Sequence, residues 1–508
     1  MTTSTANILG YTLNSTNGQG SYNLCIDASP NFKDIVTVGG IYPYYTTNGG
    51  VTWTNLASVS TPTFVHPDQH DIQYSPSGSE IYIANDGGLH KWVSSTILNV
   101  TGSMNIGEIY KIGLSSLSPD LWITGLQDNG TSIHTPSTYS FTMGGDGMDC
   151  FIDRTNDLNV FASSQFGGFN RSVDGGVSYI GAGFITGTAA WVAPWHQDPQ
   201  VPTTIYAAKS DLWRSTNMAA SFSSLTPIPI SSYVTEFQIA PSNNQFIYVI
   251  KSGNLFKTID AGNSWTNVST GLPTSLAFPS YITIDPTDEN KVWITFSGYS
   301  AGNKIYKTIN GGTSWTNVSL NLPNIPANCS VYLPGSGDGI YVGMDVGVYY
   351  MDNTMSSWIS YNTGLPNVEI SQLQISPAAP TLLRAATFGR GVYEVDILAA
   401  PVSNFSIASG PYCTGQNIQF TDLSSFSPLA WGWIANPSGG VTITSSSSQN
   451  PTINFSTPGT YSISMAAANM VGTGNTVTQT ITVNAPPSVS VSAVSQNICV
   501  GEYVVFSV

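Results

Sequence analysis

The sequence predicts an all-β protein: a β-propeller of seven to nine four-stranded blades followed by an immunoglobulin-like β-sandwich. Two stretches are near-copies of each other, residues 257–273 (KTIDAGNSWTNVSTGLP) and residues 307–323 (KTINGGTSWTNVSLNLP). Weaker copies recur along the chain at steps of 40 to 50 residues, a period typical of propeller blades. The repeat stops after residue 397, where the composition changes.

Each copy has the pattern Ser/Thr-x-Asp/Asn-x-Gly-x-Ser/Thr-Trp, as in Thr258, Asp260, Gly262, Ser264 and Trp265. A short polar side chain that accepts from its own turn, a glycine free to take a positive φ and an aromatic ring that fills a seam indicate a hairpin turn. The residues predicted to hold these turns structurally are Asn48, Trp53, Asp174, Asp260, Trp265, Asn310 and Trp315.

The spacing of the turns leaves the number of blades in the ring open. Trp53 and Tyr139 are two steps apart, so a further turn without the pattern is expected near Ser95. Strand starts number nine over residues 1–397. Either one ring has eight or nine blades, or residues 1–100 belong to a separate upstream propeller and the last seven units close a ring.

The turns resemble the Asp-box (BNR) repeats of sortilin-like, sialidase-like and xyloglucanase-like β-propellers. The segment 385–397 (AATFGRGVYEVDI) is similar to the last blade of many such proteins. The resemblance covers residues 20–397 and implies the propeller fold, with two rings in the xyloglucanase-like case. It leaves the function open, because Asp-box propellers include hydrolases, receptors and scaffolds.

Residues 401–484 predict a small β-sandwich, with alternating strands, a Trp431-x-Trp433 pair and a turn at 458–461. This segment resembles a PKD domain, and residues 485–508 resemble the truncated start of a second one. A BNR propeller followed by PKD domains is similar to large secreted surface proteins of Bacteroidetes. That resemblance implies type IX secretion and an extracellular or outer-membrane-associated location. Residues 1–20 lack a signal peptide, so we expect an excerpt of a longer polypeptide.

The composition excludes several functions. Only 8% of residues are charged and the formal net charge is -15, which argues against binding nucleic acid or anionic membranes. No apolar run approaches the ~20 residues of a membrane span. The cysteines are scattered and show neither a metal-binding spacing nor a disulfide framework.

One segment, VHPDQHDIQYSP, is a candidate metal site. His66, Asp68 and His70 alternate, so an extended strand would direct all three to one face. Two imidazoles and a carboxylate could hold a divalent metal, calcium or zinc. The alternative is that His66 and His70 hydrogen-bond to loop carbonyl groups.

Three acidic, glycine-rich loops follow, and they contain Asp86 (NDGG), Asp128 (QDNG), and Asp146 with Asp149 (GGDGMD). They recur at most about one blade apart, so their carboxylates could converge at one end of the ring. Together with Asp68 they are the candidate catalytic acids, because glycoside hydrolysis needs a carboxylate pair about 5–10 Å apart. The alternative is that each aspartate caps its own turn. Similar segments occur together in the resembling secreted proteins, which hints at a shared role.

Arginine content argues against a sialidase. That chemistry needs three converging guanidinium groups and an Arg-Ile-Pro segment, whereas the chain has five arginines and no such segment. Serine-hydrolase, Rossmann and P-loop signatures are also absent. Aromatic rings in predicted loops suit sugar stacking or protein contact. The predicted ligand contacts are Tyr44, Trp191, Trp195 and Arg390.

The leading hypothesis from the sequence is therefore a secreted or cell-surface module that binds polysaccharide or other surface proteins without catalysis. One rival is a xyloglucanase-like glycoside hydrolase that uses paired carboxylates. The other is a structural subunit of an extracellular filament or sheath. Two carboxylates in an open, aromatic cleft would favour the enzyme, and a filled channel would favour binding. The ligand and the oligomeric state are not encoded in any pattern we find.

Overall fold

The computed structural model describes most of the chain in two compact units, Met1–Val395 and Asp396–Val508. The described residues are 6–10, 12–14, 16–58, 65–334, 336, 338–353, 355–397, 400–424, 428, 430–469, 472–487, 492–493, 500 and 506–507. The predicted second sandwich at 485–508 falls almost wholly outside them. Within these described ranges all regular structure is β, apart from one short 3-10 helix, η1 (Leu56–Ser58).

The first two sheets of the chain, here called the leading sheets, each have four consecutive antiparallel strands. Their strands are β1 (Cys25–Ala28), β2 (Val36–Gly39), β3 (Pro43–Thr46), β4 (Thr54–Asn55), β5 (Gln69–Tyr74), β6 (Glu80–Asn85), β7 (Gly88–Val93) and β8 (Thr96–Asn99). Strands β1 and β2 pack against β5, and a small apolar core that includes Leu56, Ile72 and Ile83 lies between the two sheets.

Seven further sheets follow, six with four strands and the last with three. The first four sheets contain β9 (Ile109–Leu114), β10 (Trp122–Leu126), β11 (Gly130–Thr135), β12 (Thr138–Met143), β13 (Cys150–Ile152), β14 (Val160–Ser164), β15 (Gly168–Ser172), β16 (Ile180–Gly181), β17 (Trp195–Gln197), β18 (Ile205–Ala208), β19 (Leu212–Ser215), β20 (Ser223–Ser224), β21 (Val234–Ile239), β22 (Ile247–Lys251), β23 (Asn254–Thr258) and β24 (Thr266–Asn267). The last three contain β25 (Phe278–Asp285), β26 (Asp288–Ser297), β27 (Ile305–Thr308), β28 (Thr316–Asn317), β29 (Ala327–Tyr332), β30 (Ile340–Met344), β31 (Val348–Met351), β32 (Ile359–Ser360), β33 (Glu369–Ile375), β34 (Leu382–Phe388) and β35 (Gly391–Asp396).

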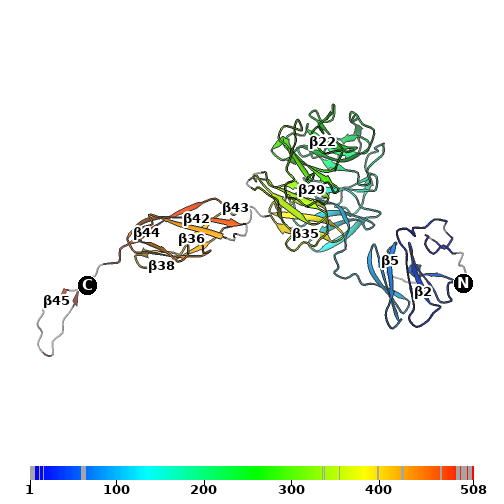
Figure 1. Ribbon diagram of the computed structural model, residues 1–508, viewed down its shortest axis with the longest axis horizontal. Helices are drawn as coiled ribbons and strands as arrows, with labels where there is room; N and C mark the ends of the chain where they lie inside the picture. The colour runs from blue at the N-terminus through cyan, green and yellow to red at the C-terminus, as the bar shows by residue number, and fades with distance from the viewer. Residues whose placement is uncertain are drawn as a thin grey trace. The chain divides into compact units, whose positions relative to one another are not determined.

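These seven sheets close into a ring, because the last sheet packs against the first. Strands β33 and β34 contact β9. The side chain of Gln372 accepts from the backbone N–H of Ile112 (2.7 Å), and buried Arg384 donates from Nη2 to the carbonyl oxygen of Pro119 (2.6 Å). Figure 1 shows β22, β29 and β35 within one rounded body. The described chain therefore has a seven-bladed propeller preceded by the two leading sheets.

The repeated turns join the third and fourth strands of the blades, with the bonds that their sequence suggests. Asp260 Oδ1 accepts from Thr258 Oγ1 (2.6 Å) and from the backbone N–H of Ser264 (2.9 Å). The indole N–H of Trp265 donates to the carbonyl oxygen of Thr226, in the preceding blade (2.9 Å). The turn therefore holds its own blade and also ties it to its neighbour. Between β7 and β8, Ser94 and Ser95 both have positive φ, which gives the turn expected near Ser95.

The turn aspartates predict a specific pH dependence. Hydrogen bonds from Ser264 and Thr258 lower the pKa of Asp260 to about 2. A carboxyl group whose pKa is lower in the folded state than in the unfolded state stabilises the fold at pH values above its unfolded-state pKa. This stabilisation is lost as the pH falls through the folded-state pKa. Replacement Asp260→Ala is expected to lower the thermal midpoint at pH 7 by about 2–4 °C.

The matched variant is Asp260→Asn, because Asn310 makes the same bonds to Thr308 and Ser314 in the next blade. We expect its midpoint to match wild type at pH 7 and to fall less between pH 4 and pH 2, as followed by circular dichroism. Equal loss of stability in the Ala and Asn variants at pH 7 would contradict the role given to this turn.

The centre of the ring is filled by side chains of the innermost strands. Glu236 on β21 is 3% exposed and lies 3.7 Å from both Lys111 Nζ on β9 and His196 Nε2 on β17. Lys111 Nζ also lies 5.3 Å from the ring centroid of Tyr281 on β25. A cluster of charged and aromatic side chains, in which Glu236 is buried and Lys111 and His196 are partly exposed, therefore joins innermost strands from four blades.

The second unit contains a β-sandwich of two sheets, in the orders β36-β38-β41-β40 and β37-β44-β42-β39. Its strands, with the short pair that follows it, are β36 (Phe405–Ile407), β37 (Tyr412–Cys413), β38 (Asn417–Asp422), β39 (Ala430–Asn436), β40 (Val441–Ile443), β41 (Thr452–Phe455), β42 (Gly459–Asn469), β43 (Gly472–Thr473), β44 (Val477–Asn484), β45 (Ser492–Ala493) and β46 (Phe506–Ser507). Its core includes Phe405, Phe420, Trp433 and Tyr461. Within the described chain, no helix has the length and apolar character of a membrane span.

Candidate functional site

Three of the acidic segments meet where the leading sheets contact the ring. Asp68 directly precedes β5, Asp86 lies in the turn between β6 and β7, and Asp128 lies in the turn between β10 and β11. Their carboxylate oxygens lie within 4.8 Å of one another. We call these three residues the acidic cluster. The expected convergence of the loops is therefore found, and it joins two parts of the first unit.

Backbone contacts fix this arrangement. The imidazole Nε2 of His66 lies 2.8 Å from the carbonyl oxygen of Asp128, and Asn129 Nδ2 donates to the carbonyl oxygen of Asp86 (2.8 Å). Gly87 packs directly under His66, where a Cβ would come within 2.5 Å of the His66 Cβ. The glycine after Asp86 is thus required by close approach, because a side chain would displace the histidine.

The structure corrects the predicted metal site. Strand β5 begins at Gln69, and Asp68 has a φ of 63°, so His66, Asp68 and His70 do not share one face of an extended strand. Both ring nitrogens of His66 lie near carbonyl oxygens, as the alternative interpretation expected. His70 Nε2 lies 2.5 Å from Asp86 Oδ1. The histidines therefore hold and orient the acidic loops.

Negative charge is concentrated at the cluster. Partial burial raises the pKa of Asp68, and the nearby Asp86 and Asp128 raise it further. The same causes raise the pKa of Glu108, and burial with the Asp86 charge raises the pKa of Tyr22 to about 12. Each shift has the sign that burial and neighbouring negative charge give to an acidic group.

The remaining two candidate acids are engaged elsewhere. Asp146 accepts from the backbone N–H of Asp128 (2.6 Å) and from Gln165, so it holds the Asp128 turn. Asp149 is 4% exposed and accepts from the backbone N–H of Trp195 (3.1 Å). The expectation that Asp149 faces a substrate is therefore wrong, because the next blade covers it.

A groove of about 780 Å³ begins beside the acidic cluster. The groove is lined by Asp86, by the segment 101–107 and by residues of the first ring blade. The walls carry Trp122, Tyr139 and Phe141, of which Tyr139 is 56% and Phe141 is 66% exposed. We call this the aromatic groove.

The aromatic groove was missed in the sequence. Tyr139 looks like the closing aromatic of a degenerate turn, and Phe141 lies outside the repeat pattern. The signal that could have found the groove was the two-residue spacing of the rings. Both lie on β12, and residues two positions apart on a strand point to the same side.

The predicted ligand contacts divide by burial. Tyr44 is 2% exposed and Trp195 is fully buried. Both are therefore core residues, and the prediction that they contact a ligand is wrong. Trp191 is 43% exposed, and its indole N–H donates to the hydroxyl oxygen of Tyr110 (3.1 Å). Arg390 is exposed in the hairpin between β34 and β35.

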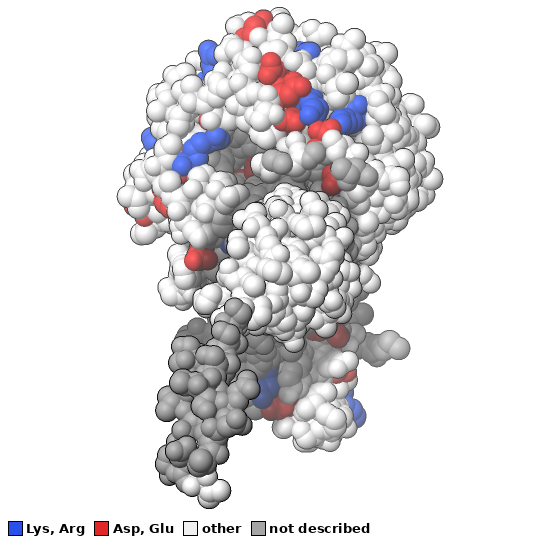
Figure 2. Space-filling view, turned by 90° about the vertical axis from the view of Figure 1, so that its left-hand side faces the viewer, with Lys and Arg blue, Asp and Glu red and all other residues white. Residues whose placement is uncertain are grey.

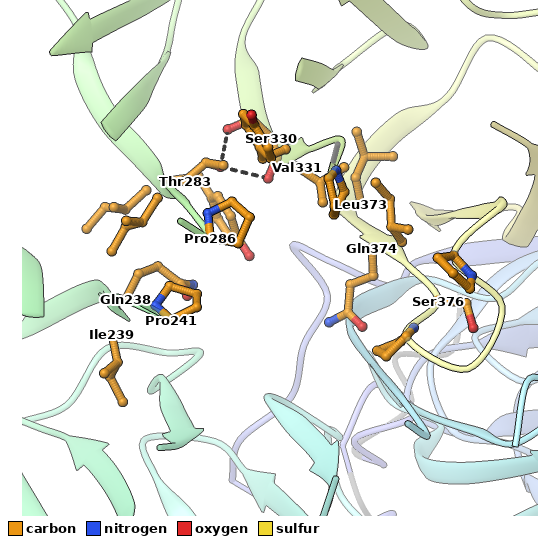
Figure 3. Close-up of a pocket in the computed structure, with 18 residues that line it drawn as sticks. Gln238, Ile239, Pro241, Thr283, Pro286, Ser330, Val331, Leu373, Gln374 and Ser376 are labelled. Atoms are coloured by element: carbon orange, nitrogen blue, oxygen red, sulfur yellow. Dashed lines mark hydrogen bonds between the residues drawn. The ribbon is translucent and has the colours of Figure 1, made fainter. Parts of the chain in front are cut away.

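A separate cavity of about 380 Å³ lies at the far ends of the inner strands (Figure 3). Prolines such as Pro241 and Pro286 rim it, and Thr283 Oγ1 lies 2.7 Å from Ser330 Oγ in its wall. None of its lining residues is an acid, a base or a histidine. Its titratable lining groups are the phenols of Tyr281 and Tyr332, so it holds no carboxylate pair of the kind that glycoside hydrolysis uses.

Comparison with known proteins supports the architecture. Residues 210–331 match the family described as sortilin, neurotensin receptor 3, and residues 404–483 match the PKD domain. These two matches cover part of the ring and the β-sandwich, and they agree with the observed order of a β-propeller followed by a β-sandwich. The comparison with curated proteins found no match.

Solved structures match the chain at low identity. An ancestral GH74 enzyme is 13% identical with a TM-score of 0.50, over 73% of this chain and 59% of that one. A GH74 enzyme from Niastella koreensis is 14% identical with a TM-score of 0.33, over 73% and 74% of the two chains. The extracellular domain of a two-component system protein from B. thetaiotaomicron is 12% identical with a TM-score of 0.41, over 91% and 68%. The chain thus spans less than two thirds of the ancestral enzyme, and the likeness to that enzyme concerns the fold alone.

Proposed function

We propose that this chain is an extracellular binding module that holds a neutral polysaccharide in the aromatic groove. The observation that carries the proposal is the pair of exposed rings, Tyr139 and Phe141, which lie on one strand and line the groove. Aromatic rings stack on the apolar faces of sugars and keep little of their surface in water when they do so. A row of such rings suits an extended chain of sugar units.

Charge favours a neutral ligand. Asp86 of the acidic cluster lines the groove, and the whole chain carries a formal net charge of -15. Figure 2 shows broad surfaces without charged side chains. An anionic polysaccharide would be repelled here, whereas hydroxyl groups can bond to the neutral polar side chains of the wall, which include Thr101, Asn105 and Asn129.

The sandwich supports an exposed, extracellular setting. Asp422 is the only charged residue between positions 404 and 483, so this domain presents a neutral, hydroxyl-rich surface. We infer that the chain belongs to a secreted, surface-associated protein that is exported by type IX secretion. Its propeller contacts polysaccharide or neighbouring surface proteins, and these contacts serve adhesion.

One observation favours a glycoside hydrolase as the second candidate. Asp86 lines the aromatic groove, and Asp68 and Asp128 lie close behind it. However, hydrolysis needs two carboxyl groups on either side of the scissile bond, about 5–5.5 Å apart in retaining and 6.5–9.5 Å apart in inverting enzymes. Asp86 is the only acid among the residues that line the groove, so no partner faces it across the ligand.

The test is binding of the chain to an array of neutral and anionic glycans, followed by titration of the best ligand. The changes Tyr139→Ala and Phe141→Ala are each expected to weaken binding about tenfold, since a stacked ring contributes about 1.4 kcal/mol. The matched control is Phe184→Ala, because Phe184 is 84% exposed and lies outside the groove. Unchanged affinity in both groove variants, or preference for anionic glycans, would refute the proposal.

A further inference from the structure

The last blade of the ring lacks a strand that the other six blades have. Its sheet has the order β33-β34-β35, and among the described strands none pairs with the outer edge of β35. The segment 101–107 reaches the beginning of this edge, where the carbonyl oxygen of Gly107 accepts from the backbone N–H of Gly391 (3.0 Å). Farther along, Val395 is 41% exposed. An uncovered strand edge is a template for a further strand, because its backbone N–H and C=O groups are free to pair.

The seams between other blades of the ring show what a fourth strand covers. Val268, directly after the fourth strand β24, packs against the next turn, where a Cβ on Gly312 would come within 2.7 Å of the Val268 Cβ. The indole N–H of Trp315 donates to the carbonyl oxygen of Val268 (2.8 Å), and that of Trp358 donates to Val318, directly after β28 (2.9 Å). Trp358 is accordingly 3% exposed. The end of a fourth strand therefore covers the aromatic residue that closes the next turn.

The seam between the last and the first blade is packed along its inner strands only. Ala386 on β34 packs with Leu126 on β10, and Arg384 Cζ lies 4.3 Å from the ring centroid of Trp122. Farther out, Tyr139 and Phe141 on β12 are 56% and 66% exposed. The exposure of these rings thus has a cause in the fold, because the preceding blade has no fourth strand to cover them.

The aromatic groove lies where that strand would run. Val392 on β35 lines the groove together with Tyr139 and Phe141 of the facing blade. Neighbouring strands of a sheet lie about 4.8 Å apart and packed sheets about 10 Å apart, so a strand added to β35 would face β11 and β12 across the groove. The interface that joins the other blades therefore continues into this groove, with one strand left out.

We propose that the outer edge of β35 binds an extended peptide segment of a partner protein, which pairs as the fourth strand of the last blade. Recognition of this kind takes its affinity from main-chain hydrogen bonds and its specificity from alternate side chains. The ring's own fourth strands indicate the side chains that fit, since residues 266–268 and 316–318 both read TNV and place the valine against the next blade. Neutral or basic flanks fit better than acidic ones, because Glu394 on β35 is exposed and the chain is acidic.

The added strand would regulate the groove. It would cover Tyr139, so the partner peptide and the polysaccharide would exclude each other. This consequence rests on the proposed function, whereas the strand site follows from the seam geometry alone. Peptide binding is therefore measured first without any glycan.

The probe is a synthetic peptide of residues 264–270 (SWTNVST), which contains the fourth strand β24, titrated into the full chain. We expect one peptide per chain and slower hydrogen exchange of backbone amides within residues 392–395. Absence of binding at millimolar peptide, or protection confined to other segments, would overturn the proposal. Self-association of the chain that the peptide reverses would make a second copy the occupant, and would also overturn the assignment to a partner protein.

Methylated peptides separate strand pairing from contact between side chains. Successive residues of a strand direct their backbone N–H groups to opposite edges, so a methyl group on the nitrogen of Thr266 blocks one edge and one on Asn267 blocks the other. One of these two peptides should lose about tenfold or more in affinity, and the other should bind like the parent peptide. Equal effects of the two methyl groups would show that no strand pairs with β35.

Variants of the two partners locate the peptide. Tyr139→Ala in the protein and Val268→Ser in the peptide should each weaken binding, whereas Phe184→Ala in the protein should not, because Phe184 lies outside the groove. A loss in Tyr139→Ala no greater than that in Phe184→Ala would refute the site. Peptide binding by a chain that binds no glycan would refute the proposed function alone. Simultaneous binding of peptide and oligosaccharide would refute the shared groove.

Discussion

Replacement Glu236→Gln is expected to lower the free energy of unfolding by about 3–5 kcal/mol, because it leaves the Lys111 ammonium buried without its partner. Glu236 Oε2 lies 3.7 Å from Lys111 Nζ, and the glutamate is 3% exposed at the ring axis. Denaturation by guanidinium chloride, followed by tryptophan fluorescence, measures the change. The matched control is Glu80→Gln, whose partly exposed pair with Lys91 should contribute far less to the free energy of unfolding.

The same pair predicts a pH dependence. Burial acts to raise the pKa of Glu236, but the charges of Lys111 and His196 outweigh it and hold the pKa below the ordinary 4.5. A carboxyl lowered in this way stabilises the fold above 4.5, and this contribution is lost as the pH falls through the folded value. Wild type should therefore lose more stability below pH 4.5 than Glu236→Gln. If Glu236→Gln lowers the free energy of unfolding at pH 7 by less than about 1 kcal/mol, the role given to the pair of Glu236 and Lys111 is contradicted.

The change Trp195→Ala is expected to lower the free energy of unfolding by about 3–5 kcal/mol, as large-to-small changes of aromatic core residues do. Trp195 is fully buried among Phe151, Phe161 and Phe169, and its indole N–H donates to the carbonyl oxygen of Asp149 (3.0 Å). Removing the ring opens a cavity between two blades and leaves that carbonyl without its donor. Chemical denaturation measures the loss.

Trp191→Ala is the matched control, because Trp191 is four positions away and 43% exposed. It should change the free energy of unfolding by at most about 0.5 kcal/mol, as exposed positions usually do. Equal losses in the two variants would contradict the assignment of Trp195 to the core and Trp191 to the surface.

The local features of the fold could be predicted because they repeat. Asp260 and Asn310 sit in the same turn of successive blades, and each tryptophan that follows ties its blade to the preceding one. Even the turn at Ser95, which lacks the pattern, follows from the spacing alone. Closure was not predictable, because it depends on contacts such as Gln372 with Ile112 between the two ends of the ring.

The candidate site was predictable only in part. The acidic loops were identified and their convergence was expected, since they recur at blade spacing. The predicted metal site of His66, Asp68 and His70 was wrong. Asp68 has a positive φ, so these residues do not alternate along an extended strand. The sequence also placed Trp195 in a loop, for a different reason. Its segment, APWHQDP, is bounded by prolines and looks like a loop, yet it forms the innermost strand β17.

The most direct test of a binding module is to incubate the chain with the neutral oligosaccharide that it binds best and measure new reducing ends. We predict that the oligosaccharide is retained at its full length, with no reducing ends above the level of a Tyr139→Ala, Phe141→Ala double variant. Release of shortened products that disappears with Asp86→Asn would contradict a binding role and identify a glycoside hydrolase.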